Sequence, residues 1–86
     1  MKKIYILCVE FYFRGDQKTE HIKAYQNIDD AKQAFEKQIE FEKNSTWISD
    51  VNQDDLDILK SPMDWYCKNL YSDDYTNVYI SEVDFE

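Results

Sequence analysis

Three residues near the start of the chain, Cys8, Glu10 and His21, have side chains that could perform nucleophilic catalysis. A cysteine thiol needs a base to become the reactive thiolate, and a histidine held by a carboxylate can supply that base. The three could meet only if the segments that carry them pair as neighbouring strands. A histidine beside a carboxylate on the surface of a sheet has the same pattern, so we expect no catalytic residue and no enzyme.

A second candidate for chemistry is the acidic stretch SDVNQDDLDILK. Asp50, Asn52 and Asp54 match the first three ligand positions of an EF-hand calcium loop. The match then fails, because Asp55 stands where the loop needs glycine, and Ser61 where it needs a bidentate glutamate. Zinc is also disfavoured, since a structural site takes four N or S ligands and the chain has one histidine and two cysteines. We expect no metal and no cofactor.

The elements that would position these residues begin with a β-hairpin. Residues 3–13 are apolar on both alternations, as in a strand inside a sheet. Gly15-Asp16 predicts a two-residue turn of the glycine-first kind, and residues 18–25 form the returning strand. The cross-strand pairs that follow from this turn are Val9 with Ile22, Leu7 with Ala24, Glu10 with His21, Cys8 with Lys23 and Tyr12 with Thr19.

A helix is predicted over residues 28–44. Asn27 is a favourable N-cap, and Asp29 and Asp30 lie in the first turn, where the helix dipole favours negative charge. Apolar residues recur at spacings of three and four and should form the buried stripe; they are Ile28, Ala31, Phe35 and Ile39.

The second half of the chain predicts a short helix over residues 50–60 and then a hairpin of residues 64–71 and 75–85. Ser61-Pro62 ends the helix, because proline disfavours helical geometry in the residue before it. In that helix the aspartates 50, 54 and 57 share one edge. We therefore expect one α+β domain over residues 1–86, an antiparallel sheet of about four strands in the order ββα, short helix, ββ, with the main helix on one face.

Charge is divided unevenly along the chain. Residues 1–44 hold eight basic and eight acidic residues, whereas residues 45–86 hold two basic and ten acidic ones and carry the whole net charge of -8. This acidity disfavours direct binding of nucleic acid and favours a basic protein surface as partner. Aromatic anchors among carboxylates suit such a surface. The residues we expect to bind the partner are Asp50, Asp54, Asp55, Asp57, Asp73 and Asp74, with Trp47 or Trp65 as the hydrophobic anchor.

Cellular location follows from weaker signals. The apolar run at the start contains Glu10 and has no small-residue cleavage site behind it, so it is not typical of a signal peptide. No stretch approaches the roughly 20 apolar residues of a membrane span. Cys8 and Cys67 are expected to be buried free thiols rather than a disulfide framework. We expect a cytoplasmic protein that does not bind membranes.

In size, acidity and its acid-rich run from Asp50 to Asp57, followed by Asp64, Asp73 and Asp74, the chain resembles small anti-defence proteins of phages and mobile elements. These include anti-CRISPR proteins, several of which occupy the DNA-binding channel of a nuclease by presenting carboxylates where phosphates would lie. The resemblance implies a non-catalytic DNA mimic that inhibits a nuclease or another nucleic-acid-binding protein. The alternative is a small homodimeric assembly domain whose acids serve only solubility, because the strand of residues 3–13 is apolar on both faces.

Overall fold

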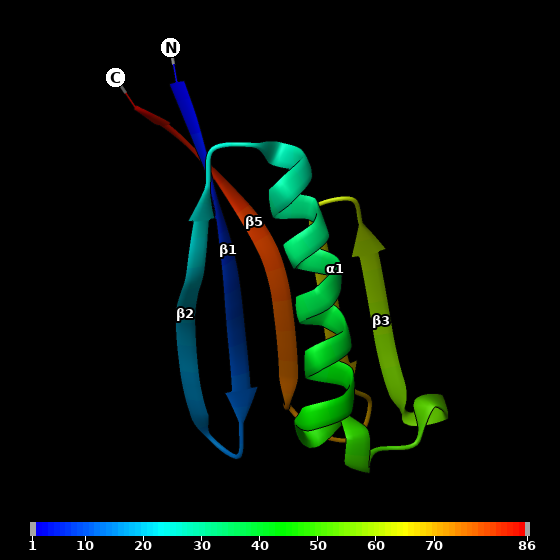
Figure 1. Ribbon diagram of the computed structural model, residues 1–86. Coiled ribbons are helices and arrows are strands. Elements are labelled where there is room, and N and C mark those ends of the chain that lie inside the picture. The colour runs from blue at the N-terminus through cyan, green and yellow to red at the C-terminus, as the bar shows by residue number, and fades with distance from the viewer. Residues whose placement is uncertain (1, 86) are drawn as a thin grey trace.

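A computed structural model describes residues 2–85 as one sheet with one long helix on a single face (Figure 1). The elements in chain order are β1 (Lys2–Phe13), β2 (Asp16–Tyr25), α1 (Ile28–Ser45), the 3-10 turns η1 (Trp47–Asp50) and η2 (Gln53–Asp55), β3 (Leu56–Ser61), β4 (Asp64–Asn69) and β5 (Tyr75–Phe85). The five strands have the spatial order β2-β1-β5-β4-β3, and all neighbours are antiparallel. The predicted α+β class is confirmed. The sheet has five strands, whereas about four were predicted.

The hydrophobic core lies between α1 and the sheet face that it covers. β1 and β5 are interior strands, and their inward side chains alternate with outward ones, as the pleat of a strand requires. The buried core side chains come from β1, β5, β4, α1 and η1; they are Leu7, Val9, Val78, Ile80, Trp65, Cys67, Ala31, Phe35, Ile39 and Ile48. Both cysteines are buried free thiols, as predicted.

The long helix forms where local signals predict it. The Asn27 side chain accepts a hydrogen bond from the backbone N–H of Asp29 at 2.7 Å, so it caps the first turn. Asp29 and Asp30 occupy that turn. The buried face of the helix consists of Ala31, Phe35, Ile39 and, beyond the predicted stripe, Glu42.

The first hairpin forms with a different turn from the predicted one. Arg14 and Gly15 are the central residues, with φ of 52° and 92°, as in a type I′ turn. Glycine suits the second position of this turn as well as the first position of the predicted one. The glycine alone therefore does not determine the register, and the predicted register is wrong. The observed pairs are Phe13 with Asp16, Val9 with Glu20, Cys8 with His21 and Leu7 with Lys23, with a bulge between the last two.

The predicted helix over residues 50–60 is wrong, because residues 53–55 form only a short 3-10 turn and residues 56–61 form a strand. After two short 3-10 turns, residues 56–61 form the edge strand β3, which pairs with β4 from Leu56 opposite Asn69 to Ser61 opposite Asp64. The acidic edge that a helix would have shown therefore does not exist. Isolated short helices are marginal in water, and like charges at helical spacing weaken them further, whereas β4 offers a ladder of backbone hydrogen bonds. The following hairpin of β4 and β5 is confirmed.

The second face of the sheet is not covered by any element within residues 2–85. Tyr12 and Tyr75 stack there with ring centroids 6.2 Å apart, and Tyr66 lies 5.5 Å from Tyr75. We call this surface the open face. As for membranes, no helix among the described residues is long and apolar enough to cross one.

Candidate functional site

One end of the molecule gathers the turns that carry most of the predicted partner-binding aspartates (Figure 1). The backbone N–H of Arg14, in the β1–β2 turn, donates to Oδ1 of Asp74, before β5, at 3.0 Å. The backbone N–H of Leu70, after β4, donates to the carbonyl of Asp55 at 2.9 Å. These bonds hold three separate segments together. We call the resulting surface the acidic end, and its aspartates are Asp50, Asp54, Asp55, Asp73 and Asp74.

Capping residues fix the segment that carries the first three aspartates. The Thr46 hydroxyl accepts a hydrogen bond from the backbone N–H of Ile48 at 3.4 Å and so starts η1. The Asn52 side chain accepts from the backbone N–H of Asp54 at 3.2 Å and starts η2. Asn52 therefore acts as a cap, and the side chains of Asp50 and Asp54 are exposed to solvent.

The loop between β4 and β5 carries the other two aspartates and is held by its own hydrogen bonds. The Lys68 ammonium donates to the carbonyls of Asn69 and Ser72 at 3.0 and 2.7 Å. The Asn69 side chain accepts from the backbone N–H of Tyr71 at 2.9 Å. The loop consequently projects Tyr71, which is 81% exposed, beside exposed Asp73.

Three of the predicted residues do not belong to the acidic end as expected. Asp57 lies on β3 directly opposite Lys68, and paired residues share one face of a sheet. Its side chain therefore lies on the open face. Trp65 is 2% exposed and lies in the core, so it cannot anchor a partner. Trp47 is half-buried, and its indole N–H donates to the hydroxyl of buried Thr76 at 3.0 Å, which makes it a wall of the site rather than a projecting anchor.

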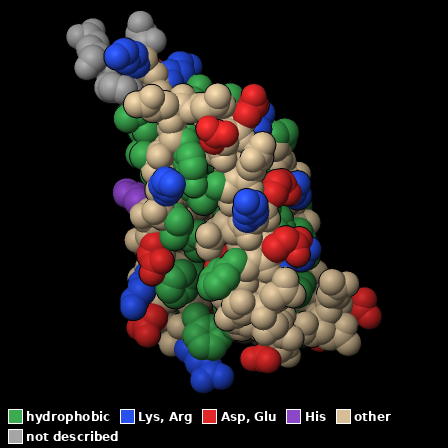
Figure 2. Space-filling view, in the orientation of Figure 1, with side chains coloured by type: hydrophobic (Ala, Val, Ile, Leu, Met, Phe, Trp, Pro, Cys, Tyr) green, Lys and Arg blue, Asp and Glu red, His purple; other side chains and the backbone are tan. Residues whose placement is uncertain are grey.

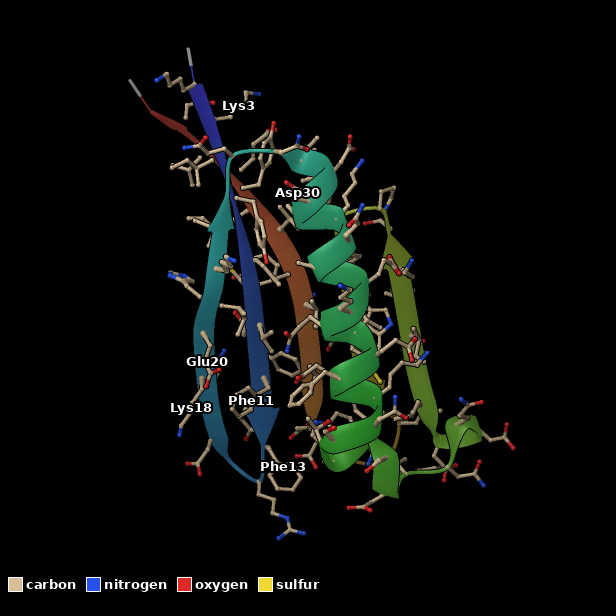
Figure 3. The ribbon with its side chains drawn as sticks, in the orientation of Figure 1. Lys3, Phe11, Phe13, Lys18, Glu20 and Asp30 are labelled. Atoms are coloured by element: carbon tan, nitrogen blue, oxygen red, sulfur yellow. The ribbon has the colours of Figure 1, made fainter. Side chains whose placement is uncertain are left out.

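A cleft of about 740 Å³ opens at the acidic end, between the C-terminal part of α1 and the end of β1. Phe11 and Phe13 lie on the helix side of β1 next to it (Figure 3). Hydrophobic side chains are exposed on this side of β1 and β2, with charged side chains around them (Figure 2). The charged residues that line the cleft are Glu42, Asp50, Asp74 and Arg14.

Glu42 is unusual among these charged residues, because only 6% of its surface is exposed. Its Oε2 accepts a hydrogen bond from Nε2 of Gln38 at 3.1 Å. Burial raises the pKa of the Glu42 carboxyl; the bond from Gln38 opposes that shift and the charge of Glu20 adds to it. Sequence reasoning missed Glu42, although it continues the spacing of the buried stripe three residues after Ile39.

No known protein family, curated protein or solved structure matches the chain.

Cys8, His21 and Glu10, the residues considered for nucleophilic catalysis, are not linked by side-chain hydrogen bonds among residues 2–85. Cys8 and His21 are cross-strand partners, but Cys8 is buried and its Sγ donates to the carbonyl of Ile6 at 3.6 Å. Glu10 accepts a hydrogen bond from the Tyr75 hydroxyl at 2.7 Å instead of orienting the histidine. Burial raises the pKa of the Cys8 thiol, which disfavours the thiolate.

Metal binding has no site of the usual kind within residues 2–85, where no group of three or more His, Cys, Asp or Glu side chains could hold an ion. Asp50 and Asp54, which the calcium pattern would bring together, belong to separate 3-10 turns. The acidic end thus offers charge, an exposed tyrosine and a cleft.

Proposed function

We propose that this chain is a non-catalytic inhibitor that binds a basic, nucleic-acid-binding surface of a partner protein through its acidic end. The observation that carries the proposal is the joining of two acidic segments, residues 50–55 and 73–74, through the hydrogen bond from Leu70 to Asp55. Five aspartates from two segments of the chain thereby share one end of the fold. The chain would then be an inhibitor of the anti-CRISPR or anti-restriction type, and its partner would be a nuclease or another nucleic-acid-binding protein whose groove normally holds phosphates.

Electrostatics supports a basic partner. Carboxylates at a protruding end steer diffusional encounter with a positively charged groove, and this gain falls as salt screens the charges. A net charge of -8 on 86 residues would repel a nucleic-acid strand, which is also negatively charged. The acidic end therefore suits competition with nucleic acid better than binding to it.

The anchor of the proposed interface is Tyr71, in place of the two tryptophans. Interface energy concentrates in a few aromatic and arginine side chains that become buried on binding. Tyr71 projects from a loop whose backbone is already fixed by Asn69 and Lys68, so little order has to be gained when it docks. Leu70 beside it is also exposed and enlarges the apolar contact.

The experiment uses a charge-reversed variant with a matched control. Asp54→Lys/Asp73→Lys changes two exposed residues of the acidic end, and Asp30→Lys/Asp84→Lys changes two exposed residues at the other end by the same charge (Figure 3 labels Asp30). Affinity capture from the producing cell, repeated with each variant, should lose its partner only with the first. Capture that is equal with both variants would refute the proposal.

The alternative is a homodimer formed through the open face. The stacked tyrosines Tyr12, Tyr75 and Tyr66 favour it, because aromatic rings are enriched at protein interfaces and this face meets no other element of the described chain. Light scattering separates the two functions. A dimer that persists at high salt favours assembly, whereas a monomer whose binding to another protein is salt-sensitive favours the inhibitor.

A further inference from the structure

Glu42 is a buried residue whose carboxylate forms no ion pair with any of residues 2–85. The ion pairs among residues 2–85 join Lys3 with Glu82, Lys43 with Glu40 and Lys60 with Glu36, and none includes Glu42. Glutamate is rarely buried to this extent unless it is paired, since removing its charge from water is costly. A position near the C-terminus of α1 adds to that cost, because the helix dipole is negative there. The neutral amide of Gln38 offsets only part of it.

The walls of the cleft suit a flat cation. Phe11, Phe13 and Trp47 contribute aromatic side chains, and the bond from Trp47 to Thr76 fixes the indole in place. The guanidinium of Arg14 already covers the Phe13 ring, 4.9 Å from its centroid, so the aromatic walls left for an incoming cation are Phe11 and Trp47. Arg14 forms no ion pair with Glu42 within the described residues, and Asp50 and Asp74 add negative charge to the lining.

We propose that the cleft receives an arginine side chain of the partner protein, with its guanidinium against the aromatic walls and paired with the Glu42 carboxylate. This inference rests on the proposed function, since it names the group of the basic partner that enters the site. Arginine is favoured over lysine because the guanidinium is planar, stacks on aromatic rings and pairs with a carboxylate through two parallel hydrogen bonds. It is also more weakly hydrated, which eases its entry into a half-buried site.

The test is a nuclear magnetic resonance titration of the whole chain with the pentapeptide Gly-Gly-Arg-Gly-Gly, blocked at both ends. We expect saturable shifts of the Glu42 amide and the Trp47 indole N–H. The same peptide with citrulline, a neutral isostere of arginine, should bind at least about tenfold more weakly. Equal binding of the citrulline peptide, or no shift at either residue, would overturn the inference; so would free arginine binding more tightly than the peptide.

A variant of Glu42 tests whether the arginine of the peptide pairs with this carboxylate. Glu42→Gln keeps the shape of the side chain and removes its charge. Its affinity for the arginine peptide should be about tenfold lower or more. Glu40→Gln, on the same helix but outside the cleft lining, is the matched control and should leave binding unchanged. Equal affinity for Glu42→Gln and wild type would refute the role of Glu42. The citrulline comparison uses the wild-type chain alone, so it decides the question even if a variant folds poorly.

Failure of this inference and failure of the proposed function give different results. If the peptide does not bind while Asp54→Lys/Asp73→Lys still loses the captured partner, the cleft is wrong and the acidic end stands. If the arginine peptide binds at Glu42 while charge reversal leaves capture unchanged, the function is wrong and the cleft is an arginine site of another kind.

Discussion

Arg14 donates its backbone N–H to Oδ1 of Asp74 at 3.0 Å, and this one bond ties the β1–β2 turn to the loop before β5. The two residues are sixty positions apart in the chain, and both line the cleft. The bond therefore helps to hold the rim of the site as well as the end of the sheet. Its carboxylate acceptor makes it stronger than a bond between neutral groups.

Removal of this bond should be measurable. Asp74→Ala is expected to lower the free energy of unfolding by about 1 kcal/mol, because a charge-assisted hydrogen bond is lost. Asp73→Ala, an exposed neighbour, should change it by less than about 0.5 kcal/mol. Urea unfolding followed by tryptophan fluorescence gives both values. Equal effects of the two variants would mean that the bond contributes nothing to stability.

The type I′ turn makes a prediction that separates the observed register from the sequence-predicted one. Arg14 has a positive φ, which a β-turn with Gly15 in the first place would not require of it. Arg14→Asn should stabilise the chain by roughly 0.5–1 kcal/mol, because asparagine adopts this conformation more readily. Thermal unfolding measures the change. A variant that is no more stable than wild type would contradict the turn assignment.

Gly15 tests the same turn from its other central residue. No atom lies within 4 Å of the place that a Cβ would occupy, so Gly15→Ala is penalised only through its φ of 92°. We expect a loss of about 1–2 kcal/mol in the free energy of unfolding. A loss well above that range would indicate a steric clash, which the structure excludes.

Glu42 should make stability depend on pH in a particular direction. Its pKa is raised in the folded chain, so the folded state holds the proton more tightly than the unfolded state. The resulting destabilisation is absent below the ordinary pKa of 4.5 and grows as the pH rises through the folded-state pKa. Glu42→Gln should therefore be more stable than wild type at pH 7, and this advantage should shrink toward pH 4.

The control for that comparison is again Glu40→Gln, whose carboxylate is exposed and pairs with Lys43 at 3.8 Å. The free energy of unfolding of Glu40→Gln should be at most about 0.5 kcal/mol lower than that of wild type at pH 7. Urea unfolding of the three proteins at pH 4 and pH 7 supplies the numbers. An advantage of Glu42→Gln that is the same at both pH values would place its cause in packing rather than in charge.

Thiol reactivity tests the hypothesis that Cys8 acts as a catalytic nucleophile with His21 and Glu10. Burial raises the pKa of Cys67 to about 11, with a smaller opposing effect of Lys43, and burial also raises the pKa of Cys8. Both should resist alkylation by iodoacetamide at pH 7.5 in the folded chain and react readily in urea, because the thiolate is the nucleophile. Mass spectrometry reads the modified residues. Rapid alkylation of Cys8 in the folded chain would revive a nucleophile assisted by His21.

The sequence predicted α1 because its signals are local. The Asn27 cap, the acidic first turn and the apolar spacing all lie within the helix itself, and tertiary packing agrees with them. Glu42 continues that spacing, but the stripe predicted from the sequence contains only apolar residues, since glutamate is mostly exposed in folded proteins. It is buried because β1 and η1 pack beside α1, an arrangement that no local pattern encodes.

Long-range pairing accounts for the errors in the second half. Residues 56–61 have an apolar spacing compatible with a short helix, and only the ladder with β4 makes them a strand. That ladder turns Asp57 away from the other aspartates, and the pleat of β4 turns Trp65 into the core. Asp50, Asp54, Asp55, Asp73 and Asp74 still meet at one end, but through loops rather than along a helix.

A competition measurement with the captured partner shows whether the acidic end takes the place of nucleic acid. Fluorescence anisotropy would follow a labelled nucleic acid on the partner while the chain is added. We predict displacement that weakens between 50 and 300 mM salt, as expected for screened charges, and that is lost with Asp54→Lys/Asp73→Lys but kept with Asp30→Lys/Asp84→Lys. Nucleic acid that stays bound at saturating amounts of the wild-type chain would contradict the account.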